Sequence, residues 1–258
     1  KYAWYKGEDN ELTLEQFLTK YKPSMVQDDG TKPWIWIRGT GSLDSHENPL
    51  LQGLEELLIL LWGLQMADDI FGQKNDAKIP IRSNKKTGVK GKKEVREQVQ
   101  AEAAEKLKNI SLKRGYTHGK WQVDYLLIFA PPDKVDVIWT SIANSLVNGP
   151  LSTTSARLAK VSTCRRDGAE NVQRLICIYL PDVYDKDSVM KVLLRNHGLN
   201  LSGVKPDLYT AIGIDSKHPS GIPSTIWKRN VLLSEAESKA LKDAYFAELS
   251  QHKKNTTT

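Results

Sequence analysis

The chain has 258 residues, of which 40% are hydrophobic, and its 37 Lys and Arg against 31 Asp and Glu give a formal net charge of +6. This composition is typical of a globular protein with one large core or two small ones. The longest apolar run, LLILLWGL at 57–64, is too short for a membrane span, which needs about 18 residues. Residues 1–20 carry no secretory pattern, and Cys164 and Cys177 cannot form a disulfide framework. We therefore expect a cytoplasmic or nuclear protein with no membrane partner, monomeric by default.

The basic charge is concentrated in one segment. Residues 72–120 hold fourteen Lys or Arg and five Asp or Glu, a balance of +9 that leaves the rest of the chain at −3. Residues 72–93 combine Gly, Pro and lysines without periodicity, which predicts a mobile insertion, and 92–114 favour a largely exposed helix that ends before Gly115. The segment from about 72 to 117 is thus read as a basic insertion that either contacts a polyanion non-specifically or forms a solvated surface. The lysines concerned are Lys85, Lys86, Lys90, Lys92 and Lys93.

Three patterns define the N-terminal part of the chain. A capping-box pattern at Thr13 and Gln16 predicts a short helix over 13–21. KPWIWIRG, at 32–39, alternates tryptophan and isoleucine, so both faces of this strand require cover and we expect it to be central. Leucines at helical spacing over 48–69 predict a helix that packs on the same sheet.

The second half alternates strand and helix patterns. Strands are predicted over 121–129, 156–164, 172–180, 207–214 and 225–228. Helices are predicted over 133–149, 185–198 and 234–250. Asp133 is the expected cap of the first helix, a Ser234–Glu237 capping box begins the last, and Asp167-Gly168 is the turn of a hairpin. Residues 251–258 are expected to be disordered.

This order of elements, with a hairpin at its centre, indicates an α+β fold in which helices cover one face of an antiparallel sheet. The other face would be free to bind. We predict a single domain over 1–233, interrupted by the basic insertion and followed by the C-terminal helix at 234–250.

Several sequence blocks resemble a known family. TLEQFLTKYKPS, WIWIRG, HGKW, AKVS, RLICIY, VKPDLYTAIGI and PSTIW are similar to the basophilic leukaemia expressed protein family, which is catalogued as a domain of unknown function. The resemblance covers most of 11–66 and 118–230, and KPDLYT is its most specific block. That family shares the fold of the cap-binding translation initiation factors of the 4E type, which HGKWQV, VDVIWTSIANSLV and KVSTCRRDGAENVQRLICIY also resemble. The resemblance implies a curved antiparallel sheet with helices on its convex face.

The same resemblance implies a site on the concave face. Cap-binding factors hold a methylated guanine between two tryptophans and read its edge with a glutamate. Here no Trp-Glu pair precedes Gly119-Lys120-Trp121, and Tyr116 is the only Trp, Tyr or Phe in 108–118, so cap recognition itself is not implied. Phosphate contacts are implied for the hairpin arginines Arg165, Arg166 and Arg174, although a solvated hairpin tip would give the same pattern.

The strand that starts at Lys120 adds further candidates. Its alternation places Trp121 with Val123 on the core face, whereas Lys120, Gln122 and Asp124 share the opposite face. Lys120 and Gln122 are therefore predicted to contact a ligand on that face.

The KPDLYT block gathers Lys205, Asp207 and Tyr209 around a proline. These side chains are candidates for binding a small polar ligand, and the alternative is a purely structural turn before a strand. Histidines and cysteines show no metal-ligand spacing, and no nucleophile motif occurs, so neither a cofactor nor a metal is expected.

The function that these patterns favour is a non-catalytic binding module for a phosphorylated, nucleotide-like ligand, either RNA or an RNA end. One alternative is a protein-interaction scaffold that uses the lysine-rich insertion and the exposed helix. A weaker alternative is an enzyme that acts on a nucleotide or small phosphate through Lys205, Asp207 and Tyr209.

Overall fold

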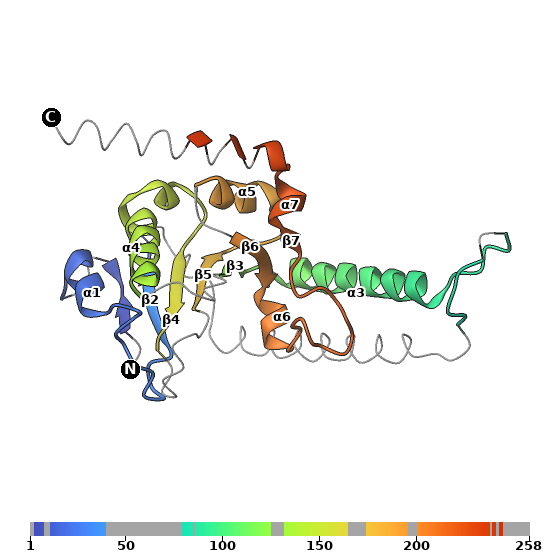
Figure 1. Cartoon of the computed structure of the whole chain (residues 1–258), viewed down its shortest axis with the longest axis horizontal. Helices are drawn as coiled ribbons and strands as arrows, with labels where there is room; N and C mark the ends of the chain where they lie inside the picture. Colours follow the sequence, from blue (N-terminus) through green and yellow to red (C-terminus); the bar gives the residue numbers. More distant parts are fainter. Residues whose placement is uncertain are drawn as a thin grey trace. The chain divides into compact units, whose positions relative to one another are not determined.

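An open seven-stranded sheet organises the fold, in the order β1-β2-β4-β5-β3-β6-β7 (Figure 1). The computed structural model describes residues 3–7, 11–39, 79–84, 86–124, 132–164, 174–195, 201–237, 239–240 and 243–244. The strands are β1 (Ala3–Tyr5), β2 (Trp34–Arg38), β3 (Gly119–Asp124), β4 (Leu158–Ser162), β5 (Leu175–Leu180), β6 (Leu201–Pro206) and β7 (Trp227–Lys228). The predicted α+β class is confirmed.

The sheet is mixed, not wholly antiparallel as predicted. β2 pairs with β4, β4 with β5, β5 with β3 and β6 with β7, all antiparallel. β1, however, runs parallel to β2, with Trp4 opposite Trp36. β1 was not predicted, because three residues are too few for a periodic pattern. β2 has neighbours on both sides, as expected of the WIWIRG strand.

One face of the sheet is the core. The register aligns Ile35 and Ile37 with Val161 and Ala159, and these in turn with Ile176 and Ile178; all six side chains are buried. Trp121 lies opposite Ile178 and is also fully buried, so its predicted core position is confirmed. Burial of these alternate residues is the main hydrophobic contribution to the sheet.

Helices α1 (Leu14–Lys20), α4 (Pro132–Asn148) and α5 (Lys186–Arg195) cover this face. The rings of Phe17 in α1 and Tyr5 in β1 lie 5.5 Å apart, and Tyr5 points to the core side because it pairs with Ile37. In α5, the Val189 carbonyl accepts a hydrogen bond of 3.2 Å from Trp121 Nε1. In α4, Leu146 approaches the strand end at Gly39 so closely that a Cβ there would lie 3.2 Å from Leu146 Cγ.

The helix starts follow local rules, with one correction. Thr13 and Gln16 form the predicted capping box of α1. Ser234 and Glu237 form the predicted capping box of the C-terminal helix. Of that helix, residues 235–237, 239–240 and 243–244 are described as helical. The prediction that Asp133 caps α4 is wrong by position, because the helix already begins at Pro132. Proline suits the first helical turn, where its missing N–H would have no partner.

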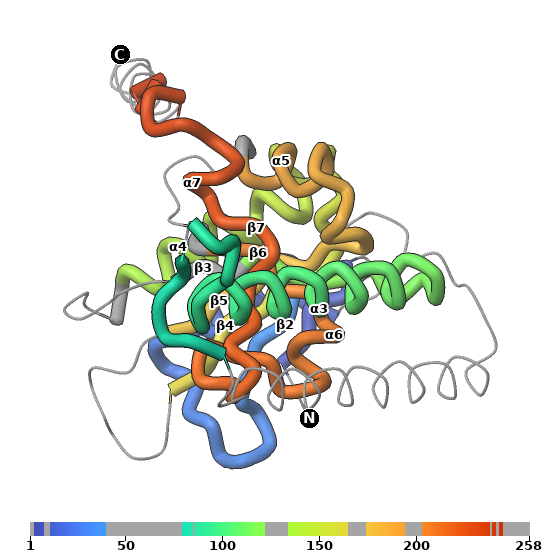
Figure 2. The backbone as a smooth tube through the Cα atoms, turned by 90° about the vertical axis from the view of Figure 1, so that its right-hand side faces the viewer, coloured from blue at the N-terminus to red at the C-terminus, as the bar shows by residue number. Residues whose placement is uncertain are grey.

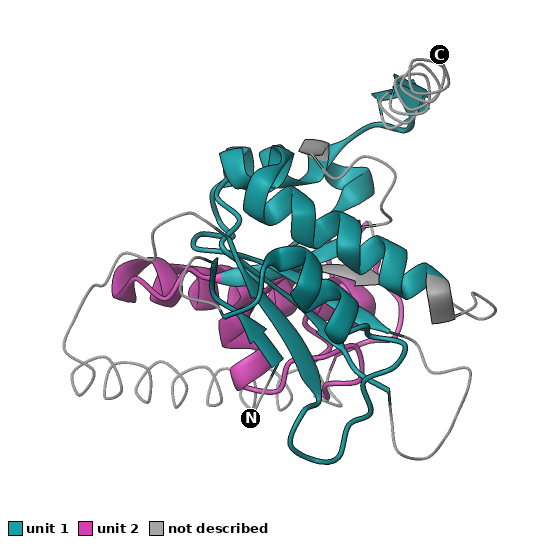
Figure 3. Cartoon of the chain, turned by 90° about the vertical axis from the view of Figure 1, so that its left-hand side faces the viewer, with its two compact units in different colours: residues 1–43, 119–204, 227–258 teal, residues 44–118, 205–226 magenta. Residues whose placement is uncertain are grey.

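The chain divides into two compact units, coloured separately in Figure 3. Unit 1 comprises 1–43, 119–204 and 227–258, and contains the helix-covered sheet together with a short 3-10 turn, η2 (Pro150–Thr153), and α7 (Arg229–Leu232). Unit 2 comprises 44–118 and 205–226, and thus includes the predicted basic insertion.

Unit 2 is built on α3 (Lys92–Arg114), which lies beside α6 (Asp207–Ala211) (Figure 2). Leu107 of α3 packs with Leu208, Tyr209 and Ile212 in its core. The predicted exposed helix that ends before Gly115 is confirmed, and Gly115 adopts φ +69, the left-handed conformation of a helix C-terminus. The predicted strand over 207–214 is wrong: the strand is β6, which ends at Pro206, and Asp207 starts a helix instead. A proline that precedes the first helical turn gives both the strand end and the helix start.

Several predictions lie outside the described residues: the helix over 48–69, the end of the 121–129 strand, the Asp167-Gly168 turn and the tail at 251–258. Among the helices that are described, none has both the length and the apolar content that crossing a bilayer requires.

Candidate functional site

An aromatic–basic face lies on the side of the sheet opposite α1, α4 and α5. The strand register creates it, because residues directly opposite each other on paired strands share a face. Trp4 pairs with Trp36, Trp36 pairs with Lys160, and Tyr179 pairs with Lys120. We define the aromatic–basic face by six residues from five strands: Trp4, Trp34, Trp36, Lys120, Lys160 and Tyr179.

The rings of this face form a stacked row. Trp4 and Trp36 lie with ring centroids 5.2 Å apart and planes 11° from parallel. Trp36 and Tyr179 lie 5.5 Å apart at 28°. Trp34, Trp36 and Tyr179 are half-buried, so the tryptophan side of the WIWIRG strand is partly covered, whereas its isoleucine side is fully buried. Each ring therefore retains π surface that water or a ligand can reach.

Two ammonium groups lie against these rings. Lys160 Nζ is 4.0 Å from the ring centroid of Trp34, 5.0 Å from that of Trp36 and 5.6 Å from that of Tyr179. Lys120 Nζ is 5.3 Å from the centroid of the same Tyr179 ring. Contacts within about 6 Å of a ring attract the cation through the ring quadrupole, by roughly 0.5–2 kcal/mol according to exposure. The rings thus position both charges among the stacking surfaces.

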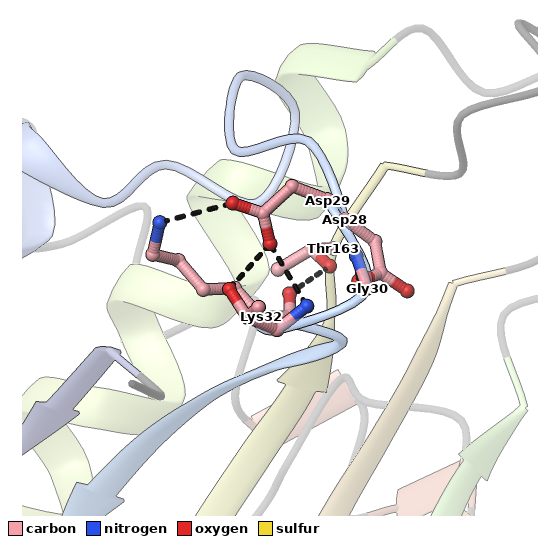
Figure 4. Close-up of polar contacts among 6 residues, drawn as sticks. Asp28, Asp29, Gly30, Lys32 and Thr163 are labelled. Atoms are coloured by element: carbon pink, nitrogen blue, oxygen red, sulfur yellow. Dashed lines mark hydrogen bonds and ion pairs between the residues drawn. The ribbon is translucent and has the colours of Figure 1, made fainter.

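A loop over 26–33 packs against the end of β4 beside this face (Figure 4). Thr163 donates a hydrogen bond of 2.7 Å to the Lys32 carbonyl, and the Asp28 N–H donates one of 2.7 Å to the Cys164 carbonyl. Within the loop, Asp29 accepts hydrogen bonds from the hydroxyl and N–H of Thr31, and lies 3.4 Å from Lys32 Nζ. The Thr31 hydrogen bonds hold the pKa of Asp29 well below its usual range, so this carboxylate stays ionised.

Arg174, a predicted phosphate contact, lies against the end of β4 at Thr163 and Cys164. Its guanidinium donates to the Thr163 carbonyl and to Cys164 Sγ, the latter at 3.0 Å. The Cys164 thiol in turn lies 3.0 Å from the Ser24 carbonyl. The Arg174 side chain thus connects the start of β5 to the end of β4. Its partners Arg165 and Arg166 lie outside the described residues.

Lys120 and Gln122 are the other predicted ligand contacts on the sheet, and both belong to β3. Lys120 is buried and belongs to the aromatic–basic face. Gln122 lies two residues further along β3, opposite Cys177, and its side chain lies outside what the structure describes.

The KPDLYT residues belong to unit 2. Lys205 is buried near the end of β6. Asp207 is the first residue of α6, and its N–H donates to the His118 carbonyl at 3.0 Å. Tyr209 is fully packed in the unit 2 core. Of the predicted polyanion contacts, Lys86, Lys90, Lys92 and Lys93 are exposed in unit 2, and Lys85 lies outside the described residues.

Sequence reasoning missed five members of the aromatic–basic face as candidate ligand contacts: Trp4, Trp34, Trp36, Lys160 and Tyr179. A signal was present, because LAKVS carries a lysine between two buried residues and RLICIY carries a tyrosine at an alternate position. Only the strand register shows that these residues lie on one face of the sheet.

No group of three or more His, Cys, Asp or Glu side chains that could hold a metal occurs in the part of the chain that the structure describes. The aromatic–basic face is instead composed of rings and ammonium groups.

The family resemblance extends over most of the chain. The sequence model of the family described as basophilic leukemia-expressed protein Bles03 matches residues 1–212. This range includes β1 to β6, and therefore every residue of the aromatic–basic face. Since the match extends over well more than half of the 258 residues, the chain belongs to the Bles03 family.

Proposed function

We propose that this protein is a non-catalytic module that binds single-stranded RNA, or an RNA end, on its aromatic–basic face. The observation that carries the proposal is the row of stacked, partly exposed rings with two ammonium groups among them. Proteins that hold single strands combine aromatic side chains, on which bases stack, with cations that track the phosphates.

The electrostatics of the face support the same ligand class. Lys160 and Lys120 both lie within 6 Å of the Tyr179 ring, so a base that stacks at this ring would place its phosphate near an ammonium group. Arg38 adds a third cation, since it lies on β2 two residues from Trp36 and therefore on the same face. A positively charged surface with stacking platforms fits a phosphorylated ligand better than a neutral one.

We also propose that the chain has the fold of the 4E-type cap-binding factors. An open, mostly antiparallel sheet, with helices on one face and a binding surface on the other, is the arrangement that the 4E-type resemblance implies. The rings used would differ from a cap-binding pair, because they come from β1, β2 and β5 and no Trp-Glu pair precedes Lys120.

The test is a fluorescence anisotropy titration of the chain with a labelled eight-nucleotide RNA, with and without a 5′ phosphate, between 50 and 300 mM salt. Tyr179→Leu removes a stacking surface, and we expect affinity to fall by roughly 5- to 150-fold, since stacking of one base contributes about 1–3 kcal/mol. Lys160→Met removes the ammonium but keeps the aliphatic chain, and we expect the slope of log affinity against log salt to shrink by about 0.7.

Lys228→Met is the matched control, because Lys228 is an exposed lysine of β7 in the same unit. It should leave both affinity and salt slope unchanged. Absence of binding at 50 mM salt, or equal losses in Lys228→Met and Lys160→Met, would show that the aromatic–basic face does not recognise RNA.

A further inference from the structure

A second surface lies at the N-terminal end of α3 in unit 2. We define the tip segment as residues 79–84 together with 86–91. Its two legs run antiparallel: Asn84 N–H donates to the Val89 carbonyl at 2.9 Å, and Lys92 N–H donates to the Pro80 carbonyl at 2.8 Å. Figure 1 shows both legs extending from the start of α3. The tip segment therefore has a defined backbone.

Two glycines make this geometry possible. Gly88 adopts φ +70 in the turn, a conformation that side chains with a Cβ rarely adopt. The legs approach each other closely at Gly91, since a Cβ at this position would be 2.5 Å from the Ser83 nitrogen. The close approach of the legs thus depends on these positions.

Each leg of the tip segment presents an aliphatic side chain to solvent. Ile81 is 81% exposed, the highest value among the large hydrophobic residues that the structure describes, and Val89 is 47% exposed. Both residues belong to the tip segment, and exposed aliphatic groups gain free energy when they leave water for an apolar environment.

Cations surround these aliphatic groups. Residues 79–96 contain seven Lys or Arg and a single carboxylate, Glu94, a formal balance of +6. Arg82, Lys86 and Lys90 in the tip segment are exposed, and so are Lys92, Lys93 and Arg96 in the first turns of α3. The ion pair of Lys93 with Glu97, at 3.9 Å between largely exposed side chains, neutralises little of this charge.

We propose that the tip segment binds peripherally to an anionic lipid surface, with Ile81 and Val89 entering the interface and the cations contacting lipid headgroups. Weak hydrophobic insertion and a basic cluster are the two signals that together give stable membrane association. This binding requires no spanning helix, so it revises the expectation of no membrane partner, which rested on the lack of a span.

The chemistry of the tip segment favours lipid over RNA. Single-stranded RNA is held by aromatic rings, and residues 79–96 contain no Trp, Tyr or Phe. Aliphatic side chains such as Ile81 gain little from phosphates or bases, whereas they gain from transfer into an acyl region. The tip segment and the aromatic–basic face therefore have different ligands, and the first does not depend on the second.

The experiment is co-sedimentation of the full chain with vesicles of phosphatidylcholine, either pure or containing phosphatidylserine, at 50 and 300 mM salt. We expect binding only to the anionic vesicles, weakened by salt. The double variant Ile81→Ser/Val89→Ser keeps every charge and should lower the partition coefficient tenfold or more. The double variant Lys86→Glu/Lys90→Glu should lower it by at least 25-fold, since each charge contributes about fivefold.

Val137→Ser is the matched control, because Val137 of α4 is also an exposed aliphatic residue, 69% exposed and remote in sequence from the tip segment. It should bind as the native chain does. Failure to bind anionic vesicles at 50 mM salt would overturn the proposal. The proposal would also be overturned if the Ile81→Ser/Val89→Ser variant bound the vesicles as tightly as the native chain and oligouridine displaced this binding completely. That result would assign the tip segment to nucleic acid.

Discussion

Two buried tryptophans of unit 1 differ in a way that yields a sharp prediction. Trp121 in β3 and Trp139 in α4 are 0% and 1% exposed. The Nε1 group of Trp121 donates to the Val189 carbonyl at 3.2 Å, whereas that of Trp139 is buried and finds no acceptor in the described part of the chain. The same substitution, Trp→Phe, should therefore have different effects at the two positions.

The magnitudes follow from the hydrogen bonding. Trp121→Phe removes a buried hydrogen bond with a net contribution of about 0.5–1.5 kcal/mol. Trp139→Phe removes an unsatisfied buried N–H, whose desolvation costs about 1–3 kcal/mol. The loss of ring volume is common to both variants and largely cancels in the comparison. We expect Trp121→Phe to be less stable than Trp139→Phe by at least about 1.5 kcal/mol.

Urea unfolding followed by circular dichroism measures this difference, provided that both variants keep the same dependence of stability on urea. Because both tryptophans belong to unit 1, the transition to compare is the same one. If Trp139→Phe destabilises the chain as much as Trp121→Phe does, the Trp139 N–H has a partner such as an ordered water, and the reasoning fails.

Three further predictions concern stability. Gly39→Ala places a Cβ 3.1 Å from the Leu146 carbonyl oxygen, and should lower the free energy of unfolding by roughly 1–3 kcal/mol in the same urea assay. Tyr209→Ala leaves a cavity in the unit 2 core and should cost about 3–5 kcal/mol, seen as faster hydrogen exchange in α3; unchanged protection would contradict the core assignment. Asp185, whose pKa the Ser188 hydroxyl and N–H lower from its ordinary 3.8, stabilises the start of α5 only while ionised. The native chain should therefore be more stable than Asp185→Asn at pH 7, by less than about 1 kcal/mol because the group is exposed. This difference in the free energy of unfolding should disappear as the pH falls through the lowered pKa. A difference that persists at pH 2 would contradict this.

Local sequence patterns correctly predicted the helix ends and helix faces that a few neighbouring residues determine. The Thr13 capping box, the inward Val189, Val192 and Leu193 of α5 and the Gly115 helix end all depend on contacts within one or two turns. The 207–214 segment failed for the opposite reason. Its apolar residues alternate as in a strand, but they pack on α3, a partner distant in sequence that only the folded unit 2 supplies.

The candidate site was predicted only where a residue's own strand determined its direction. Alternation along β3 correctly separated Trp121 from Lys120. Tyr209 was proposed for its polar neighbours, yet its ring fills the unit 2 core. For Arg174, the basic hairpin pattern could not indicate that the guanidinium donates back to Thr163, since that contact depends on the register between β4 and β5.

The register is also what makes the aromatic–basic face a single surface. A shift of β4 by one residue would turn Lys160 into the core and Ala159 or Val161 toward Trp36, because side chains alternate with a period of two. Such a shift would bury an ammonium under α4 and expose apolar residues, which costs several kcal/mol. The same burial pattern that stabilises the sheet therefore fixes Lys160 among Trp34, Trp36 and Tyr179. A surface held this rigidly is preorganised, and a ligand that binds it has little ordering entropy to overcome.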